Sequence, residues 1–346
     1  MSFSANSSSR EAIQAIQFEL WPDCNGHCKF CYLNGTKRVT TKKEKIENIN
    51  STIKTLKNPD LMRKYNAVGL IGGEFFAGQI KGIETEFTAL IDLLNSMLCL
   101  REIKEVWITS SLLFDHNDLD KTISILNRFN FDELAEDQRI ILCTSYDTIG
   151  RFDFDIGEET DSEDEVNAEQ AWRNNLKALY NRFPKLTLHT QTILTEDVIE
   201  KLIENPDYFD FITRYSMLDF RYPSITRADC PTATVIEDYR SIMMSRLDKF
   251  PEHFFIEKRN KFLKCLKVLA EKYGLEKVKN LIHQPEMRSR RLIIYVEGAE
   301  IEDRWNDDRN VYLECGHLVD GLCYVDSDDK CIYCDIEKFI ENQENI

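Results

Sequence analysis

Short apolar runs alternate with longer segments of helical periodicity over the first two thirds of the chain. The runs are rich in Val and Ile, as strands buried in a parallel sheet require. Six of them are predicted strands: 16–20, 68–72, 106–110, 140–145, 186–192 and 211–216. The segments between them are predicted helices: 43–57, 84–100, 118–129, 169–183 and 196–204. This alternation predicts an α/β fold of right-handed βαβ units, and six units fit an open, partial (β/α)6 barrel better than a closed barrel of eight.

The pattern changes after residue 218, and this change sets the predicted domain boundaries. Residues 1–11 are expected to be a flexible N-terminus, and 12–218 the partial barrel. Residues 219–290 are predicted to be a helical extension, because 227–249 and 257–273 have helical periodicity. Residues 291–346 form a small Cys-rich module that begins with a strand candidate at 292–296.

Composition and charge narrow the function classes. The chain has 346 residues and a formal net charge of -16, and residues 152–170 contain nine acids and no Lys or Arg. We interpret that acidic run as a solvated insertion, and the acidic surface argues against broad contact with nucleic-acid backbone. The sequence has no apolar run of membrane-span length and no apolar signal core, so a cytoplasmic protein without a membrane segment is expected.

Seven of the eleven cysteines fall into two tight groups, which in a cytosolic chain favours metal ligation over disulfides. The first group is Cys24, Cys28 and Cys31, directly after the first predicted strand. Thiolates are soft ligands that hold iron–sulfur clusters, and three on one loop leave the fourth iron of a four-iron cluster without a protein ligand. Half of a zinc site, or three incidental thiols, is the alternative interpretation.

This Cys-x3-Cys-x2-Cys pattern, with the aromatic Phe30 before the last cysteine, resembles the signature of the radical S-adenosylmethionine (radical SAM) enzymes. The resemblance covers roughly residues 12–218. It implies that Cys24, Cys28 and Cys31 hold a [4Fe-4S] cluster whose open iron chelates S-adenosylmethionine (SAM). One electron from that cluster then splits SAM into methionine and a 5′-deoxyadenosyl radical.

Residues after the later strands are matched to the same family. The second predicted strand ends in Gly72, Gly73 and Glu74, which resembles the family's Gly-Gly-Glu motif; by this resemblance they would bind the SAM amino group. Two glycines permit close backbone approach, and a carboxylate accepts hydrogen bonds from an ammonium. The other SAM contacts that the resemblance implies lie on the third, fourth and fifth strands: Ser110, Ser145 and Gln191.

Five further side chains near the strand ends carry weaker expectations. Cys143 is expected to be a core residue. Arg151 could pair with a carboxylate of SAM or substrate, because its guanidinium favours bidentate contacts. His189 could face either the barrel lumen or the helices. Arg214 and Tyr215 are candidate substrate contacts on the sixth predicted strand.

The C-terminal cysteines form a second candidate metal site. Cys315, Cys323, Cys331 and Cys334 lie within twenty residues, together with His317. A structural zinc site is favoured, with four thiolates or with three thiolates and the imidazole. An auxiliary iron–sulfur cluster is the alternative.

The resemblance implies a radical SAM enzyme that acts on a small, nucleotide- or nucleobase-type or amino-acid-type substrate, with an electron donor such as flavodoxin or ferredoxin. Peptide maturation and viral DNA-base hypermodification are alternative roles within the same superfamily. A rival from another class is a non-catalytic zinc-binding interaction protein. The basic stretch from Lys37 to Lys45 could receive a phosphate-bearing substrate or the reductant, although a solvated helix start explains it better.

Overall fold

The protein is described from a computed structural model. The structure describes residues 14–25, 39–76, 78–146, 151–152, 155–156, 166–193, 196–221, 264–265, 267–274, 290–294, 302–303, 310–312 and 318–320.

One eight-stranded sheet organises the molecule, in the order β10-β9-β1-β2-β3-β4-β7-β8. All neighbours are parallel except the β10–β9 pair. The strands of this sheet are β1 (Gln14–Glu19), β2 (Ala67–Ile71), β3 (Glu105–Thr109), β4 (Arg139–Ser145), β7 (Thr187–Ile193), β8 (Met217–Arg221), β9 (Arg290–Ile294) and β10 (Glu302–Asp303). The order β1-β2-β3-β4-β7-β8 follows the chain, as successive βαβ units of an open barrel do. The predicted α/β class is therefore confirmed.

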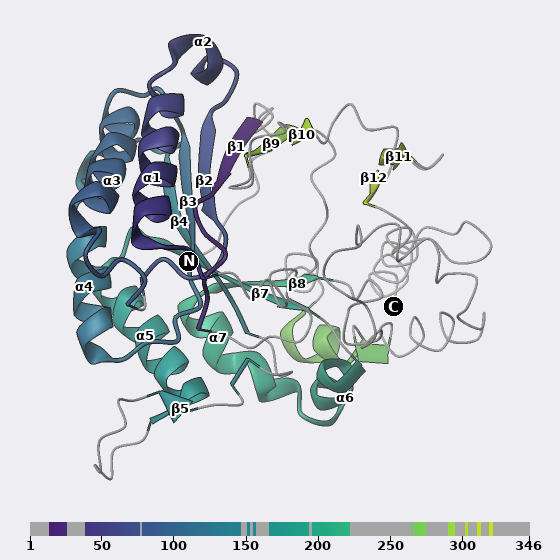
Figure 1. Ribbon diagram of the computed structural model, residues 1–346. Helices are drawn as coiled ribbons and strands as arrows, with labels where there is room; N and C mark the ends of the chain where they lie inside the picture. The colour runs from purple at the N-terminus through teal and green to yellow at the C-terminus, as the bar shows by residue number, and fades with distance from the viewer. Residues whose placement is uncertain are drawn as a thin grey trace, which may run out of the picture.

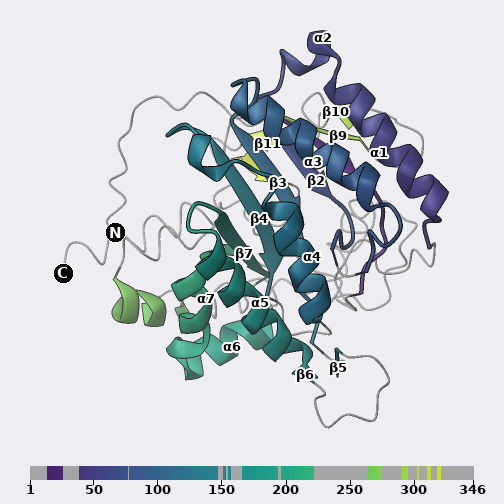
Figure 2. The same ribbon diagram turned by 90° about the vertical axis from the view of Figure 1, so that its left-hand side faces the viewer.

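The helices connect successive strands and lie on one face of this sheet, as Figures 1 and 2 show. They are α1 (Lys42–Leu56), α2 (Pro59–Met62), α3 (Glu84–Cys99), α4 (His116–Leu126), α5 (Ala168–Arg182), α6 (Glu196–Glu204) and α7 (Asp210–Tyr215). Short 3-10 turns occur at Phe131–Glu133 and Pro206–Phe209. Residues 267–273 are also helical, and Lys272 of this segment pairs with Asp207 and Asp210.

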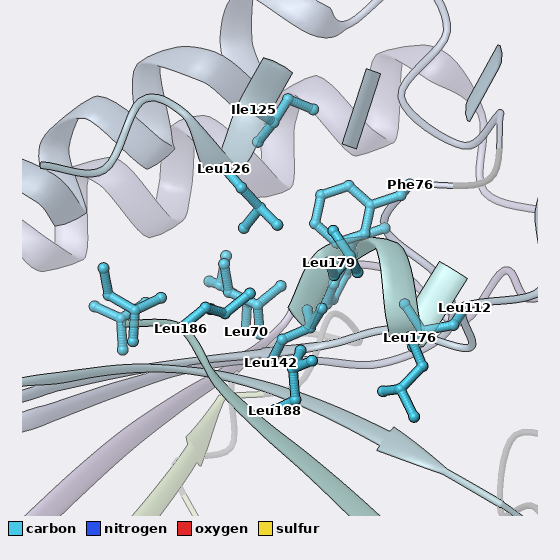
Figure 3. Packing of buried hydrophobic residues seen from close by; sticks show 14 of the residues in the cluster. Leu70, Phe76, Leu112, Ile125, Leu126, Leu142, Leu176, Leu179, Leu186 and Leu188 are labelled. Carbon is cyan, nitrogen blue, oxygen red and sulfur yellow. The ribbon is translucent and has the colours of Figure 1, made fainter. Parts of the chain in front are cut away.

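The main core lies between the sheet and these helices (Figure 3). Strands β2, β4 and β7 contribute Leu70, Leu142 and Leu188, which are buried against Leu126 of α4 and Leu176 of α5, among other side chains. Since apolar area removed from water stabilises a fold by roughly 25 cal/mol per Å², this layer fixes the strands that carry the site.

Strand alternation divides the sheet residues between two faces. On β4 the helix-facing residues are buried and the intervening ones are half-exposed. Register extends the half-exposed face across the sheet, since Thr109 lies beside Cys143, Cys143 beside His189, and Ser145 beside Gln191. We call this the open face of the sheet, and it is largely polar at these positions.

Two expectations from the sequence are wrong. Residues 211–216 are not the sixth strand: 210–215 form α7, and the strand is β8. A short apolar run does not distinguish a helix from a strand. Asn205 and Pro206 begin a helical turn just before this segment, and α7 follows that turn directly. Cys143 is not a core residue, because it points away from the helices with the other half-exposed residues of β4.

The remaining strands lie in two small sheets and at the edge of the large one. β5 (Asp155–Ile156) and β6 (Val166–Asn167) pair antiparallel at the two ends of the acidic run. β11 (Asn310–Tyr312) pairs with β12 (Leu318–Asp320), and β9, from the predicted C-terminal module, extends the main sheet beside β1. Within the described residues, no helix has the length and apolarity to cross a membrane.

Candidate active site at the carboxyl ends of the strands

The predicted SAM-binding residues and the first cysteine all lie at the carboxyl edge of the parallel sheet. Cys24 follows β1, Gly72–Glu74 follow β2, and Ser110 follows β3. Ser145 ends β4 and is in register with Gln191 of β7. Parallel strands present their carboxyl ends at one edge, so the topology alone gathers these residues.

The two glycines are packed against the backbone that leads into Cys24. The Gly73 N–H donates to the Trp21 carbonyl at 2.9 Å, and the Glu74 N–H donates to the Asp23 carbonyl at 2.7 Å. A Cβ on Gly73 would lie 1.8 Å from that Asp23 oxygen, and one on Gly72 would lie 2.5 Å from the Trp21 oxygen. Gly72 also has a φ of +138°, which side chains rarely adopt. The Gly-Gly pair therefore sets the path of the chain into the cysteine loop.

The Glu74 side chain is fully buried and is held by three neighbouring residues. Its carboxylate accepts from the Phe76 N–H at 2.7 Å, from the Ser110 hydroxyl at 3.1 Å and from the Ser111 N–H. A carboxylate has about four acceptor positions, and these three donors occupy most of them. Ser110 and Glu74 thus belong to one hydrogen-bonded unit.

Asn25, directly after Cys24, is anchored to the loop that follows β3. Its side-chain oxygen accepts from the Ser111 hydroxyl at 2.9 Å, and its nitrogen donates to the Leu113 carbonyl. Ser111 also donates its backbone N–H to Glu74, so one residue links the Gly-Gly-Glu segment to the cysteine loop. Leu112, between the two contacts, has a φ of +55°, an uncommon conformation for a non-glycine residue.

Asp23, directly before Cys24, is anchored to α1, and this contact was not predicted. Its Oδ1 accepts from the Thr40 N–H at 2.9 Å, and its Oδ2 lies 3.3 Å from the Lys45 ammonium. Lys45 also donates to the Gln79 side chain at 2.7 Å and lies 5.0 Å from the centre of the Trp21 ring. Both charged side chains are only 9% exposed. The sequence interpretation placed Lys45 in a solvated basic stretch, which is wrong for this residue.

The spacing of apolar residues in α1 could have identified Lys45. It lies four residues before Ile49 and eleven before Leu56, all on the buried face of the helix. Lys43, by contrast, is 86% exposed and pairs with Glu47 on the outer face.

The second part of the site joins the ends of β4 and β7. The Tyr146 N–H donates to the Gln191 carbonyl at 2.9 Å, which keeps Ser145 and Gln191 adjacent. The Tyr146 hydroxyl donates to Glu169 at 2.5 Å, and Arg173 contacts both. Burial raises the pKa of Tyr146, and the Glu169 carboxylate raises it further, so this phenol stays protonated at any physiological pH.

The other candidate side chains are placed as follows. Arg151 is buried, and its Nη2 donates to the Ser111 carbonyl at 2.9 Å, so it contacts the loop that also holds Asn25. His189 belongs to the open face and not to the helix side. Arg214 and Tyr215 lie on α7, where Tyr215 packs against Tyr180 and Phe211, so neither is at a strand end as expected.

The other cysteines of the two groups and His317 lie outside the described residues; these cysteines are Cys28, Cys31, Cys315, Cys323, Cys331 and Cys334. Among the residues that the structure describes, no three His, Cys, Asp or Glu side chains are grouped as metal ligands. Cys24 is exposed at the sheet edge, between two anchored neighbours. A loop of three thiolates that starts from such a fixed point fits an iron–sulfur cluster in its donor chemistry.

Two comparisons with known proteins found nothing, and one found structures of similar fold. No family model and no curated protein matches the chain. Streptococcus suis SuiB bound to S-adenosylmethionine matches with 15% identity over 83% of this chain and 59% of that one, with a TM-score of 0.40. SuiB bound to the precursor peptide SuiA matches with 14% identity over 86% of this chain and 63% of that one, with a TM-score of 0.41.

The chain thus spans about three fifths of the length of these SuiB chains. At this level the likeness is one of fold. The radical SAM resemblance, the substrate and the reaction all rest on this chain's own residues.

Proposed function

We propose that this chain is a radical SAM enzyme. The observation that supports it best is the direct contact between the two motifs. The Gly72–Gly73 pair packs on the backbone of Trp21 and Asp23, which leads directly into Cys24. A cysteine triad or a Gly-Gly-Glu segment alone is a weak signal, but their direct contact is what a shared cofactor site requires.

Each group of residues has its own role in this proposal. Cys24, Cys28 and Cys31 hold a [4Fe-4S] cluster, and Gly72, Gly73 and Glu74 orient the amino group of SAM. The bound cluster would supply the electron that cleaves SAM to methionine and a 5′-deoxyadenosyl radical, which abstracts hydrogen from the substrate.

Three hydroxyl and amide side chains complete the binding site. Ser110 donates to the Glu74 carboxylate and so holds it in position for the SAM amino group. Ser145 and Gln191 are adjacent across β4 and β7. Ser145 contacts the carboxylate or ribose of SAM, and Gln191 contacts the ribose.

The open face supports a polar substrate. Thr109, Ser145, His189 and Gln191 lie on it, half-exposed, on the side of the sheet away from the helices. Hydrogen-bonding groups of this kind suit a small nucleotide-, nucleobase- or amino-acid-type substrate that is rearranged or modified. Peptide maturation is an alternative, and SuiB is bound to a precursor peptide in one of its structures. Viral DNA-base hypermodification is another.

A low-potential donor such as flavodoxin or ferredoxin would reduce the cluster. We further propose that Cys315, Cys323, Cys331 and Cys334 bind zinc, or else a second iron–sulfur cluster. A cytoplasmic location fits both metal sites.

Metal content and SAM cleavage together test the proposal. Anaerobically reconstituted protein should contain about four irons at the first site and form 5′-deoxyadenosine from SAM after reduction. A non-catalytic zinc protein would instead contain zinc at both cysteine groups, with neither iron nor SAM cleavage.

A further inference from the structure

Asp23, the residue before Cys24, forms a buried ion pair with Lys45 at the base of the cysteine loop. No step of the proposed chemistry requires this ion pair. We define the loop anchor as Asp23, Thr40 and Lys45. The Asp23 carboxylate contacts both other members through different oxygens, Thr40 N–H at 2.9 Å and Lys45 Nζ at 3.3 Å. Since Asp23 and Thr40 are seventeen residues apart and enclose all three cysteines of the first group, the carboxylate joins the two ends of the cysteine loop.

The surroundings of the anchor make it rigid. Lys45 is in the first turn of α1, whose N-terminus is fixed by a capping box between Thr41 and Glu44. Gln79 and the Trp21 ring hold the Lys45 ammonium from two further sides. On the other side, the Asp23 carbonyl accepts from the Glu74 N–H. The anchor therefore connects the cysteine loop, α1 and the Gly-Gly-Glu segment.

The cost of burial argues that this pair has a role beyond stability. Buried ion pairs contribute little net stability, because desolvation offsets their attraction, and a pair of apolar side chains would often serve as well. What a buried pair with additional hydrogen bonds does well is to fix one geometry. Here that geometry is the position of the residue that precedes Cys24.

We propose that Lys45 and Asp23 are positioning residues for the cluster: they close the cysteine loop before metal arrives, so that Cys24, Cys28 and Cys31 can bind one cluster together. This inference rests on the proposed function. Closing a loop in advance removes the entropy that metal binding would otherwise have to overcome.

Four variants and a matched control separate this role from a general loss of stability. Lys45→Met keeps the length of the side chain and removes its charge, and Asp23→Asn keeps an acceptor for Thr40 and removes the charge. The double variant leaves no buried charge, and Lys45→Arg restores the cation. Lys43→Met is the control, because Lys43 is in the same helix turn but pairs with Glu47 at the surface.

Hydrogen exchange and iron content are the two readouts. In the cluster-free protein, Lys45→Met should speed exchange of the Thr40 amide by about tenfold or more, while amides of the β3 and β4 core keep their protection. After reconstitution, Lys45→Met and Asp23→Asn should each hold less than about half the iron of the wild type, with an altered EPR spectrum of the reduced cluster. Lys45→Arg and the double variant should recover iron relative to Lys45→Met, and Lys43→Met should match the wild type.

The inference is overturned if Lys45→Met keeps wild-type Thr40 protection and wild-type iron, or if Lys43→Met loses as much iron as Lys45→Met. A wild-type protein that takes up no iron and does not cleave SAM refutes the proposed function instead. In that case unchanged Thr40 exchange would refute loop closure independently, because this readout needs no cluster.

Discussion

Replacing Gly73 with alanine tests whether the Gly-Gly pair positions the cysteine loop. The new Cβ would lie 1.8 Å from the Asp23 carbonyl oxygen and 2.4 Å from its carbon, and both atoms belong to backbone that cannot rotate away. To relieve this overlap the Asp23 peptide must move by roughly 1 Å, because close-packed interiors offer no free volume. Cys24, the next residue, would move with it.

The expected loss of stability follows from the contacts of Asp23. Its displacement breaks the 2.7 Å hydrogen bond from the buried Glu74 N–H, and an unsatisfied buried donor costs about 1–3 kcal/mol. Disturbance of the Lys45 ion pair adds to this, so we expect a loss of about 2–4 kcal/mol. Urea-induced unfolding of the cluster-free protein measures it, and iron content after reconstitution should fall in parallel.

Gly78→Ala is the matched control. Gly78 has a φ of +71°, so alanine is strained there by about 1 kcal/mol, but the nearest atom to the new Cβ is 3.8 Å away. If Gly73→Ala is no less stable than Gly78→Ala and binds iron like the wild type, the reasoning about the cysteine loop is refuted.

Three further predictions concern other parts of the chain. Glu74→Gln should weaken SAM binding about tenfold or more, because it removes a charge-assisted contact to an ammonium, while iron content stays above half that of the wild type. Isothermal titration measures the SAM affinity, and a collapse of iron content with unchanged SAM affinity would make Glu74 purely structural. Replacing 157–165 by Asn-Gly, a two-residue turn between paired β5 and β6, should leave SAM cleavage within about twofold. Loss of cleavage in a protein with native circular dichroism would show that the acidic run belongs to the site. Cys331→Ser should lower expression and lose about one zinc per chain, measured by elemental analysis, while the iron of the first cluster remains. About eight irons and no zinc in the wild type would instead indicate a second cluster.

Much of the fold was predictable, because buried parallel strands are apolar runs that periodicity detects. The predicted strands at 68–72 and 106–110 differ from β2 and β3 by one residue at each end. The prediction at 211–216 failed because the segment is too short for either period to stand out. For Cys143, a continuous apolar run located the strand but could not tell which face each side chain takes.

The site was predictable only where a motif resembles a family. The carboxyl ends of the strands bring Cys24, Gly73 and Glu74 together as the resemblance implies, and the roles of these residues stay predictions. Asn25 and Lys45 were missed, because their partners, Ser111 and Asp23, are 86 and 22 positions away in sequence and no motif connects them. Long-range polar contacts of this kind are fixed by packing and not by local pattern.

The most direct test of the central claim is the formation of 5′-deoxyadenosine from SAM by reduced, reconstituted protein, measured for the wild type and for Cys24→Ala, Cys28→Ala and Cys31→Ala. We predict product with the wild type and none above the protein-free background with each variant, because each cysteine supplies one of the three bonds that hold the cluster. Cleavage retained in all three variants, or absent from a wild-type protein that contains a full complement of iron, would contradict the assignment.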